Sequence, residues 1–571
     1  MTAQRFALGT SDFLRLREAG LRYVDKSAFI TEILRSEAHV LLLPRPRRFG
    51  KTLNLSTLAA YLERTEQDRS ALFEDLAVWQ AGDDVRAHFG RHPVLFLTFK
   101  DVKERSWADA IERVSRLVAT EALRHRATIE AVLSAEERRQ FEQLCAATAS
   151  PVALSQSLRQ LSQWLHRATG EHVVILVDDC DAPMHAALQH EYSDDAALLI
   201  GNLLSGAFKD NSHLFRGVMT GILGSAKGSN FSGLNNVAVY SLLSRPFAAH
   251  FGFSLQEVES LAAETGLAHR LPEIERWYNG YRFGGHTIYN PWSVLSFLAN
   301  PVDGLKPYWV QTSSDDILRE LLVEGGRVDG GDLETLLSGG AITKPVDEHL
   351  VLREVRASSA SVWSFLLFSG YLRADAFVGD DAMGRPQWSL TVPNLEVRRA
   401  FSSLFANFLD RGLGGDDRTA QLCRALLSGD AQTFGKLLGE LLAHALSYHD
   451  VGGRRPEAVY QAFVVGLLVR LDASHEVSSN REAGYGRVDV LVSPRKPGEA
   501  GVVLELKVID HDEGETAQSA LAAALRQVRE RDYAAALRER GAGVVHQLGA
   551  VFDGKRAWVA AVGDGQNNAN E

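Results

Sequence analysis

Four short runs of apolar, strand-forming residues recur through the first half of the chain. They are His39–Leu43, Pro93–Thr98, His172–Val177 and Arg216–Leu223. Successive side chains of a strand point to opposite faces of a sheet, and in each run most residues of both sets are apolar. This is expected of a strand that is buried on both sides. Stretches with helical periodicity lie between them, for example Trp107–His125 and Leu154–Ala168. This alternation predicts an α/β fold whose first domain is a mostly parallel sheet with helices on both faces.

The pattern changes beyond residue 255. From Leu255 to Leu441 it is mainly helical, and a Gly- and Arg-rich stretch at Val451–Pro456 then marks a boundary. Strands and helices return after it: a helix at Glu457–Leu471, strands at Arg487–Ser493, Gly501–Val508 and Val544–Phe552, and a helix at Thr516–Arg540. A chain of 571 residues exceeds what one core serves. We predict a first domain at 1–255, a mainly helical middle region at 256–445, an α/β domain at 446–562 and a polar tail at 563–571.

Composition excludes several classes of protein. Hydrophobic residues are 45% and charged residues 23%, which is ordinary for a globular chain. The three cysteines are far apart, so neither a zinc site nor a disulfide framework is indicated. No apolar run reaches the roughly 18 residues of a membrane span, and no secretory signal is evident. We expect a cytoplasmic protein without membrane contact. Its net charge of −11 argues against a protein whose whole surface binds nucleic acid, but it does not exclude a local basic channel.

The first apolar run leads directly into the string Pro44-Arg45-Pro46-Arg47-Arg48-Phe49-Gly50-Lys51-Thr52. Its end fits a phosphate loop. Gly50 allows close backbone approach, Lys51 would reach the β- and γ-phosphates, and Thr52 would offer its hydroxyl to Mg²⁺. The standard pattern has glycine where this chain has Arg45, and a bare Gly-Lys-Thr also occurs by chance. On pattern alone the match is incomplete.

Two acids follow the third run, and a threonine lies near the carboxyl end of the fourth. Asp178 and Asp179 follow Val173–Val177, where such folds hold Mg²⁺ and orient the attacking water. Thr220 would lie at the same edge of the sheet, within reach of a γ-phosphate. The plain alternatives are a solvated acidic turn and an ordinary strand threonine. The order of the motifs favours a nucleotide site.

A second group of charged residues lies near the C-terminus. Asp489 ends Gly486-Arg487-Val488-Asp489, and Glu505 and Lys507 lie in Val502–Lys507. If Ser493 pairs with Gly501, the antiparallel register places Asp489 opposite Glu505, and like charges there repel. A divalent cation between them would remove that penalty, with Lys507 on the same face as Glu505. This arrangement is suited to phosphodiester cleavage.

Other interpretations of this segment stay open. A solvent-facing hairpin with a Glu/Lys pair would give the same residues, although its strands are too apolar for a surface hairpin. Glu457 could be a further acidic ligand, or a first-turn residue that suits the helix dipole. Gln527 on the following helix could contact the site or DNA, but taken alone it is better explained as an ordinary helical residue.

Eight segments between residues 9 and 293 resemble the AAA-ATPase-like proteins of bacteria and some archaea. They are Gly9–Asp12, Tyr23–Lys26, Arg45–Thr52, Val177–Pro183, Thr220–Ile222, Phe231–Asn236, Trp277–Tyr281 and Tyr289–Ser293. Such proteins characteristically end in a nuclease domain of the PD-(D/E)XK superfamily, which Ser479–Asp489 and Leu504–Lys507 resemble. The similarity spans almost the whole chain.

The resemblance implies a P-loop NTPase sheet, a mainly helical middle region and a restriction-endonuclease-like C-terminal domain. Arginine is typical of the family at position 45. From the motifs and the resemblance together, we expect the nucleotide-binding residues to be Arg45, Gly50, Lys51, Thr52, Asp178 and Thr220. We expect Asp489, Glu505, Lys507 and Asp179 as catalytic residues, and Asp489, Glu505, Glu457, Thr52 and Asp178 as metal ligands.

One departure bears on turnover. The family usually has Glu then Tyr where this chain has Asp179 and Cys180. Asp is one methylene shorter, and a misplacement of about 1 Å can cost on the order of 10²-fold in rate. Binding of ATP is therefore better supported than fast hydrolysis. The aromatic group Trp277, Tyr278, Tyr281, Tyr289 and Trp292 could stack on a base, but packing at a domain junction is the commoner use of such a cluster.

We expect an enzyme that binds ATP and cleaves nucleic acid with Mg²⁺, or with Mn²⁺ at the nuclease site. DNA is favoured over RNA, and ATPase activity is weak if present. Defence or mobile-element biology is suggested by analogy, and oligomerisation stays open. One alternative is a nucleotide-switched signalling or interaction protein with slow or no turnover. Another is a nucleic-acid-binding scaffold with an idle nuclease, against which the intact Asp489, Glu505 and Lys507 argue.

Overall fold

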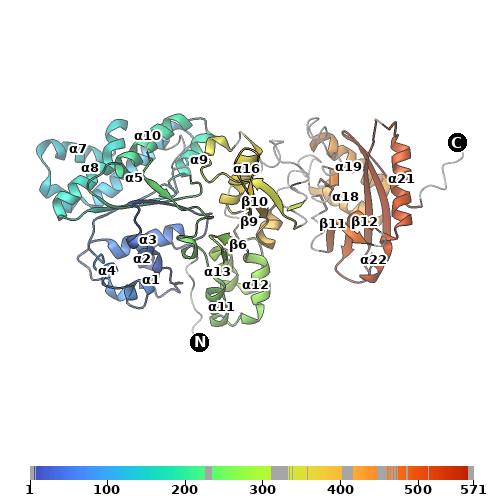
Figure 1. Ribbon diagram of the computed structural model, residues 1–571, viewed down its shortest axis with the longest axis horizontal. Helices are drawn as coiled ribbons and strands as arrows, with labels where there is room; N and C mark the ends of the chain where they lie inside the picture. The colour runs from blue at the N-terminus through green and yellow to red at the C-terminus, as the bar shows by residue number, and fades with distance from the viewer. Residues whose placement is uncertain are drawn as a thin grey trace. The chain divides into compact units, whose positions relative to one another are not determined.

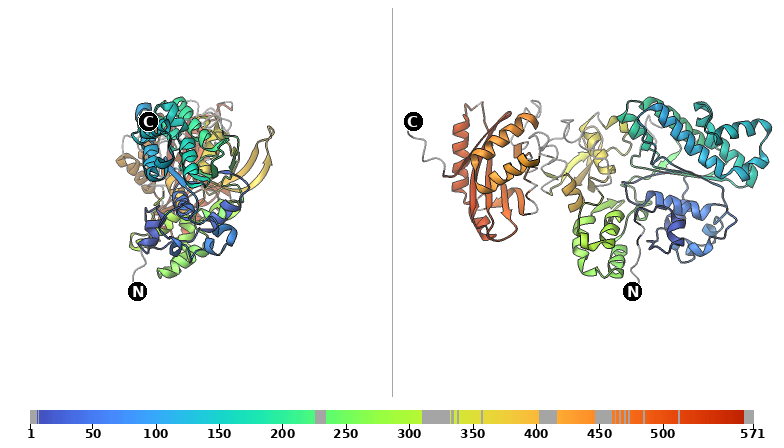
Figure 2. Two further views of the ribbon diagram at one scale, coloured as in Figure 1. Left: turned by 90° about the vertical axis from the view of Figure 1, so that its left-hand side faces the viewer. Right: turned by 180° about the vertical axis from the view of Figure 1, so that it is seen from behind.

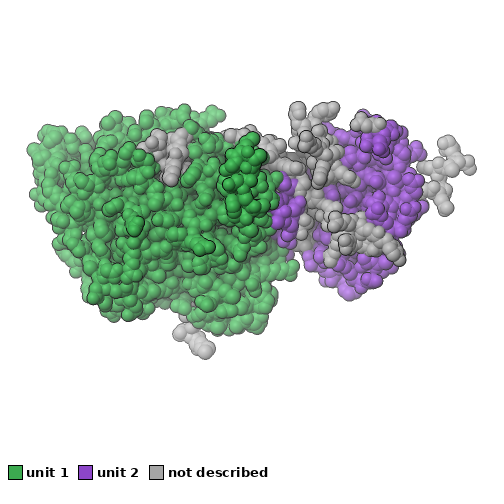
Figure 3. All heavy atoms as spheres, in the orientation of Figure 1, with its two compact units in different colours: residues 1–313, 343–396 green, residues 314–342, 397–571 purple. Residues whose placement is uncertain are grey.

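The computed structural model describes residues 6, 8–224, 234–309, 332, 335–336, 339–355, 358–401, 416–445, 460–461, 463–464, 467–468, 471, 474–483, 486–511 and 513–563. The chain divides into two compact units (Figure 3). Unit 1 comprises Met1–Ser313 and Thr343–Glu396, and unit 2 comprises Ser314–Ile342 and Val397–Glu571. No helix in the described part of the chain combines the length and apolar character needed to cross a bilayer.

Unit 1 is built on a parallel sheet of five strands in the order β2-β3-β4-β1-β5. The strands are β1 (Val40–Pro44), β2 (Val94–Thr98), β3 (Val173–Asp178), β4 (Leu214–Gly221) and β5 (Val237–Val239). The first four confirm the predicted runs, and β5 is an additional edge strand. Strand β4 lies between β1 and β3, pairing Leu43 with Thr220 and Val177 with Met219. The carboxyl ends of these strands therefore meet at one edge.

Helices cover both faces of this sheet (Figures 1 and 2). One face carries α5 (Trp107–Arg124), α7 (Ala135–Cys145), α8 (Pro151–Thr169) and α10 (Ser193–Phe208), and the other carries α1 (Phe13–Glu18), α2 (Ala28–Arg35), α3 (Lys51–Leu62) and α4 (Asp83–Arg86). Local signals set the ends of α8. The Ser150 hydroxyl accepts from the amide of Ala153, Pro151 opens the first turn, and Gly170 ends the helix at φ 74°.

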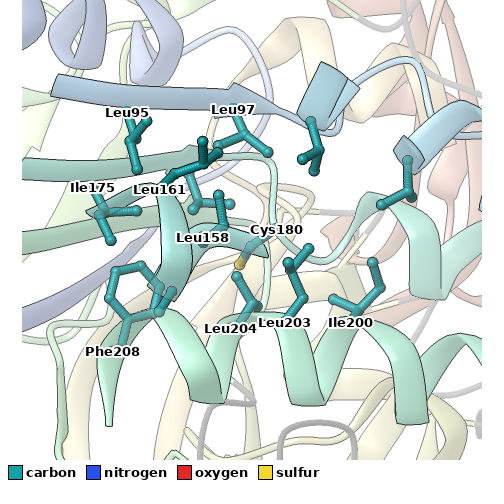
Figure 4. Packing of buried hydrophobic residues seen from close by; sticks show 14 of the residues in the cluster. Leu95, Leu97, Leu158, Leu161, Ile175, Cys180, Ile200, Leu203, Leu204 and Phe208 are labelled. Atoms are coloured by element: carbon teal, nitrogen blue, oxygen red, sulfur yellow. The ribbon is translucent and has the colours of Figure 1, made fainter. Parts of the chain in front are cut away.

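The core of unit 1 lies between the sheet and the first of these helical layers. Leu95 and Ile175 of the sheet pack with Leu158 of α8 and Leu203 of α10 (Figure 4). Fully burying such a side chain stabilises the fold by roughly 1.5–3 kcal/mol. Packing is close, because a Cβ at Gly217 would lie 2.6 Å from the ring of Phe208.

The middle region contains helices and two small sheets. Its helices in unit 1 are α11 (Leu255–Glu264), α12 (Leu271–Tyr278), α13 (Pro291–Ala299) and α16 (Ser359–Phe368). One sheet pairs β6 (Tyr281–Phe283) with β7 (His286–Ile288). The other has three strands in the order β8 (Ile342–Pro345), β10 (Pro386–Thr391) and β9 (Arg373–Asp380). The helical periodicity did not anticipate these short strands. Trp277, Tyr278 and Tyr289 pack in a hydrophobic core with α11 and α13.

Unit 2 has a five-stranded sheet in sequence order. The strands are β11 (His475–Ala483), β12 (Gly486–Pro494), β13 (Gly501–Val508), β14 (Val545–Asp553) and β15 (Arg556–Ala561), with only β13 and β14 parallel. Helices α18 (Asp416–Ser428) and α19 (Ala431–Ala445) pack on one face and α21 (Ala517–Glu530) and α22 (Tyr533–Glu539) on the other (Figure 1). The helix predicted at Thr516–Arg540 is thus two helices, separated at Asp532, whose φ is 45°. The β12–β13 register, with Val490 opposite Leu504, confirms the predicted pairing.

Candidate nucleotide and nuclease sites

The loop between β1 and α3 occupies the sheet edge where the strand ends meet. Gly50 precedes the first residue of α3 with φ 85°, and Arg48 has φ 69°. Positive φ at these two positions turns the chain sharply from strand to helix. Lys51 and Thr52 consequently lie in the first helical turn, where the helix dipole and the backbone amides favour an anion.

Three threonine hydroxyls converge on the carboxylate of Asp178. Thr52 donates to Oδ2 and Thr220 to Oδ1, each over 2.7 Å. Thr98, at the end of β2, donates to Oδ2 over 3.2 Å. Burial raises the pKa of Asp178, and the charge of Asp179 raises it further. The fold thus brings three predicted site residues together. Thr98 was missed by the sequence analysis, although its place at a strand end is the same signal that singled out Thr220.

The Lys51 ammonium lies at the centre of the loop. It is 3.3 Å from Oδ1 of Asp179 and donates to the carbonyls of Arg45 and Pro46 over 3.2 and 3.3 Å. Only 6% of the side chain is exposed. Asp179 itself has φ 48°, a conformation that Asp tolerates better than most residues. The ion pair holds both predicted side chains at the mouth of the loop.

The Arg45 guanidinium lies inside the fold. It donates to the carbonyls of Pro44 and Tyr240 over 2.7 and 2.8 Å, and it lies 4.9 Å from the ring centre of Phe251. Burial lowers its pKa to about 9. The side chain therefore stabilises the loop through contacts inside the fold. Arg45 contacts Lys51 through its backbone carbonyl. A role for Arg45 in nucleotide binding stays a prediction.

Asp181 fixes the neighbouring strand end. Its Oδ2 accepts from the amides of Ile222 and Leu223 over 2.8 and 3.0 Å. Burial alone would raise its pKa, but His185 and these two amides lower it to about 2. Asp181 is not among the residues predicted from the sequence for this site, because a third acid after a strand is also typical of a turn.

A cavity of about 440 Å³ opens over the phosphate loop within unit 1. Seven basic and three acidic side chains other than histidine line it: Arg22, Lys26, Arg47, Arg48, Lys51, Lys100 and Lys103, against Asp101, Asp179 and Asp181. Four of the chain's twelve lysines are among them. Tyr23, Val24, Phe253 and Trp292 supply an apolar part. Trp292 is thus the member of the predicted aromatic group that lines the cavity, with the Arg48 guanidinium 4.3 Å from its ring centre.

In unit 2, Asp489 and Glu505 occupy neighbouring strands β12 and β13. Oδ2 of Asp489 accepts from the backbone amide of Leu506 over 2.8 Å, so its carboxylate lies between positions 505 and 507 of the next strand. Gln461 donates to the Asp489 carbonyl over 2.9 Å. Glu505 is 2% exposed, and Lys507 is half-buried on the same face of β13. The three predicted residues are therefore brought together.

Helix α21 adds two groups to this site. The Gln527 amide donates to Oε1 of Glu505, so the contact treated as less favoured from the sequence is present. Arg531, at the end of the same helix, donates to the hydroxyl of Tyr533 over 3.2 Å. This hydrogen bond raises its pKa, and the charges of Glu505 and Asp489 raise it further. The spacing of four between Gln527 and Arg531 places both on one helix face and could have indicated them.

The donor set of Asp489 and Glu505 fits a hard divalent cation, because Mg²⁺ and Mn²⁺ prefer carboxylate oxygens. Within the residues described by the structure, no group of three histidine, cysteine, aspartate or glutamate side chains is arranged to hold a metal. Glu457, predicted as a further ligand, lies outside the described residues. Among the described residues of this site, the carboxylates of Asp489 and Glu505 are therefore the candidate ligands for an ion.

Two family models match the chain. Residues 7–231 match a model described as "Predicted AAA-ATPase", and residues 455–561 match the PD-(D/E)XK nuclease superfamily. A protein of Azotobacter chroococcum mcd 1, described as an uncharacterized protein in the vnfD 5′ region, is 28% identical over 565 residues and 97% of each chain. A Walker-type ATPase of Pyrococcus abyssi matches with a TM-score of 0.33 and 11% identity, over 66% of this chain and 94% of that one. The two family matches confirm the resemblance drawn from the motifs.

Proposed function

We propose that this chain, which joins an AAA-ATPase-like domain to a PD-(D/E)XK nuclease-superfamily domain, is an ATP-controlled, metal-dependent nuclease. The observation that carries the proposal is the position of the Asp489 carboxylate, which accepts from the amide between Glu505 and Lys507. Two carboxylates on adjacent strands repel each other unless a cation lies between them. A bound Mg²⁺ or Mn²⁺ would polarise a phosphodiester and lower the pKa of a bound water.

The residues around this pair support that chemistry. Lys507 projects from the same face as Glu505 and would place an ammonium beside a phosphate that gains charge during cleavage. Gln527 holds one oxygen of Glu505 and so orients the other. The Arg531 side chain adds positive charge near both carboxylates. We propose DNA as the substrate, RNA being the less favoured choice, and a place in defence or mobile-element biology by analogy.

The cavity of unit 1 supports ATP binding. Lys51 would turn from the carbonyls of Arg45 and Pro46 to the β- and γ-phosphates, and Thr52 and Asp178 would hold Mg²⁺. Lys100, Lys103 and Arg47 add positive charge to the same cavity. The apolar part around Tyr23 and Phe253 suits a base.

The test is cleavage of plasmid, single-stranded DNA and RNA, with Mg²⁺ or Mn²⁺ and with or without ATP. Asp489→Asn should abolish cleavage with every substrate while ATP binding is retained. Lys51→Ala should weaken ATP binding at least tenfold and abolish the effect of ATP on cleavage. The proposal fails if no substrate is cleaved under any condition, or if Asp489→Asn cleaves as the wild type does.

A nucleotide switch is the second candidate, and the ion pair between Asp179 and Lys51 favours it. A carboxylate bound to Lys51 is poorly poised to orient an attacking water, so turnover would be slow. Phosphate release at saturating Mg²⁺–ATP decides between them. Under the switch, Asp179→Asn leaves an already low rate unchanged. Under catalytic use of Asp179, the same change lowers the rate at least tenfold, and Asp101→Asn, in the same cavity, does not.

A further inference from the structure

Two tryptophans of the middle region contact the phosphate loop. The Trp309 indole N–H donates to the carbonyl of Arg47 over 3.0 Å, and the Arg48 guanidinium stacks over Trp292. The Trp292 indole N–H donates in turn to the carbonyl of Tyr308, the residue before Trp309. Arg47 and Arg48, the two residues directly before Phe49, are thus connected to the short segment Tyr308–Trp309 of the middle region.

Glu396 holds the two tryptophans together. Its Oε1 accepts from the backbone amide of Trp309 over 2.7 Å. The Ser293 hydroxyl, next to Trp292 on α13, lies 2.9 and 2.8 Å from its two oxygens. Glu396 is fully buried, where an unsatisfied carboxyl would be costly. The Glu396 carboxyl therefore favours the arrangement in which the Trp309 amide and the Ser293 hydroxyl both contact it.

The positions of these residues along the chain give the contacts a further consequence. Unit 1 consists of Met1–Ser313 and Thr343–Glu396. Trp309 therefore lies four residues before the chain first passes into unit 2, and Glu396 is the last residue before it passes finally. Trp309 and Glu396, one before each point where the chain enters unit 2, are hydrogen-bonded to each other. Trp309 is also hydrogen-bonded to the Arg47 carbonyl of the phosphate loop, so these contacts within unit 1 connect both points to the loop.

We propose that Trp309 and Glu396 form a latch that reports occupancy of the phosphate loop to the two points where the chain enters unit 2. The latch rests on ATP binding as proposed above. Phosphate groups that take up the loop amides and Lys51 would reposition Arg47 and Arg48, and through them Trp309 and Trp292. Coupling of this kind requires only that ATP favour one arrangement of the latch over another.

The deciding variant is Trp309→Phe in the full chain. It removes the N–H donated to Arg47 but keeps an aromatic ring and the backbone amide donated to Glu396. Trp164→Phe is the matched control, because Trp164 is also buried in unit 1 and donates its indole N–H, to Glu137, far from the loop in sequence. Three quantities are measured: ATP affinity, the effect of ATP on cleavage, and ATP-induced hydrogen-exchange protection of residues 390–401.

Trp309→Phe should keep ATP affinity within about threefold of the wild type. It should reduce both the ATP-induced protection and the effect of ATP on cleavage at least about fivefold. Trp164→Phe should retain both. Wild-type coupling in Trp309→Phe, or equal loss in Trp164→Phe, would overturn the latch. The ATP affinity of the wild type separates failure of the latch from failure of the proposed function. A wild type that does not bind ATP would overturn both, whereas one that binds ATP leaves the latch to be decided by the two variants.

Glu396 provides a second test should Trp309→Phe fail to fold. Glu396→Gln can still accept from the Trp309 amide and contact Ser293, whereas Glu396→Ala can do neither. The latch predicts ATP-induced protection in the glutamine variant and at least a fivefold smaller effect in the alanine variant at equal ATP occupancy. Equal protection in both would overturn it.

Discussion

Gln527 shows how a single side chain can set the geometry of the nuclease site. Its amide holds Oε1 of Glu505, which is otherwise almost fully buried at the floor of the site. Partners that orient a metal ligand typically contribute 10–100-fold in affinity or activity. Gln527→Ala should therefore lower Mg²⁺-dependent cleavage at least about tenfold and raise the Mg²⁺ concentration for half-maximal activity.

The control for this prediction lies on the same helix. Gln518 is exposed on α21, so Gln518→Ala removes a glutamine without touching the site. Its cleavage should stay within about twofold of the wild type. A Gln527→Ala protein with normal cleavage and normal Mg²⁺ dependence would contradict the orienting role.

Glu396 should make the stability of unit 1 depend on pH. Burial raises the pKa of this carboxyl to about 8, and the hydrogen bonds from Trp309 and Ser293 only partly oppose the rise. In the unfolded chain the group ionises near its ordinary value of 4.5. Between these values the folded protein holds a proton that the unfolded chain has lost, so the free energy of unfolding falls as pH rises.

The measurement compares the wild type with Glu396→Gln in denaturant unfolding at pH 6 and pH 8. Because the amide does not titrate, the stability of the variant relative to the wild type should increase by about 2–3 kcal/mol over this interval. Taking the difference removes the contribution of other titrating groups. A relative stability independent of pH would mean that Glu396 ionises normally in the folded protein.

At the scale of elements, the turn from β1 into α3 depends on the conformation of Gly50. Its φ of 85° is unfavourable for any residue with a Cβ, although no atom lies within 4 Å of the place a Cβ would take. Gly50→Ala should therefore lower the free energy of unfolding by about 1–2 kcal/mol from backbone strain. It should also weaken ATP binding, since the added methyl lies at the helix N-terminus where phosphate would bind.

Gly90 separates these two effects. It has φ 62° and equally open surroundings, but it lies outside the phosphate loop. Gly90→Ala should lose similar stability and keep wild-type ATP affinity in a fluorescent-nucleotide titration. If both variants bind ATP normally, the loop does not approach phosphate through Gly50.

Elements with strong local signals were predictable from the sequence. The four buried strands of the first sheet and the β12–β13 register follow from apolar runs and a defined turn. The strands β5, β11 and β15 were missed, because edge strands such as β15 carry mixed residues that only the neighbouring strand makes extended. The short strands β6 to β10 were hidden in the same way among helices.

The candidate sites divide along the same line. Lys51, Thr52 and Asp178 stand at strand or helix ends, where position implies role, and the fold places Thr52 beside Asp178. Asp489 and Glu505 lie within neighbouring strands, and the turn between these strands sets the register that brings them together. Arg45 was assigned from a family pattern, which cannot tell a side chain that points into the fold from one that points to a ligand. Trp309 and Glu396 meet across 87 residues of sequence, a distance over which no local pattern extends.

At the scale of the whole molecule, each unit has its own hydrophobic core, so thermal unfolding should show two transitions. Leu158→Ala and Leu548→Ala, fully buried in units 1 and 2, should each lower one transition by the equivalent of 2–5 kcal/mol and so assign it. Mg²⁺–ATP at about 100 times its Kd should stabilise the transition of unit 1 by about 2.7 kcal/mol and leave that of unit 2 nearly unchanged. Lys51→Ala should lose this shift. A single transition lowered equally by both leucine variants would instead mean that the units unfold together, and then occupancy of the phosphate loop would act on the nuclease through global stability.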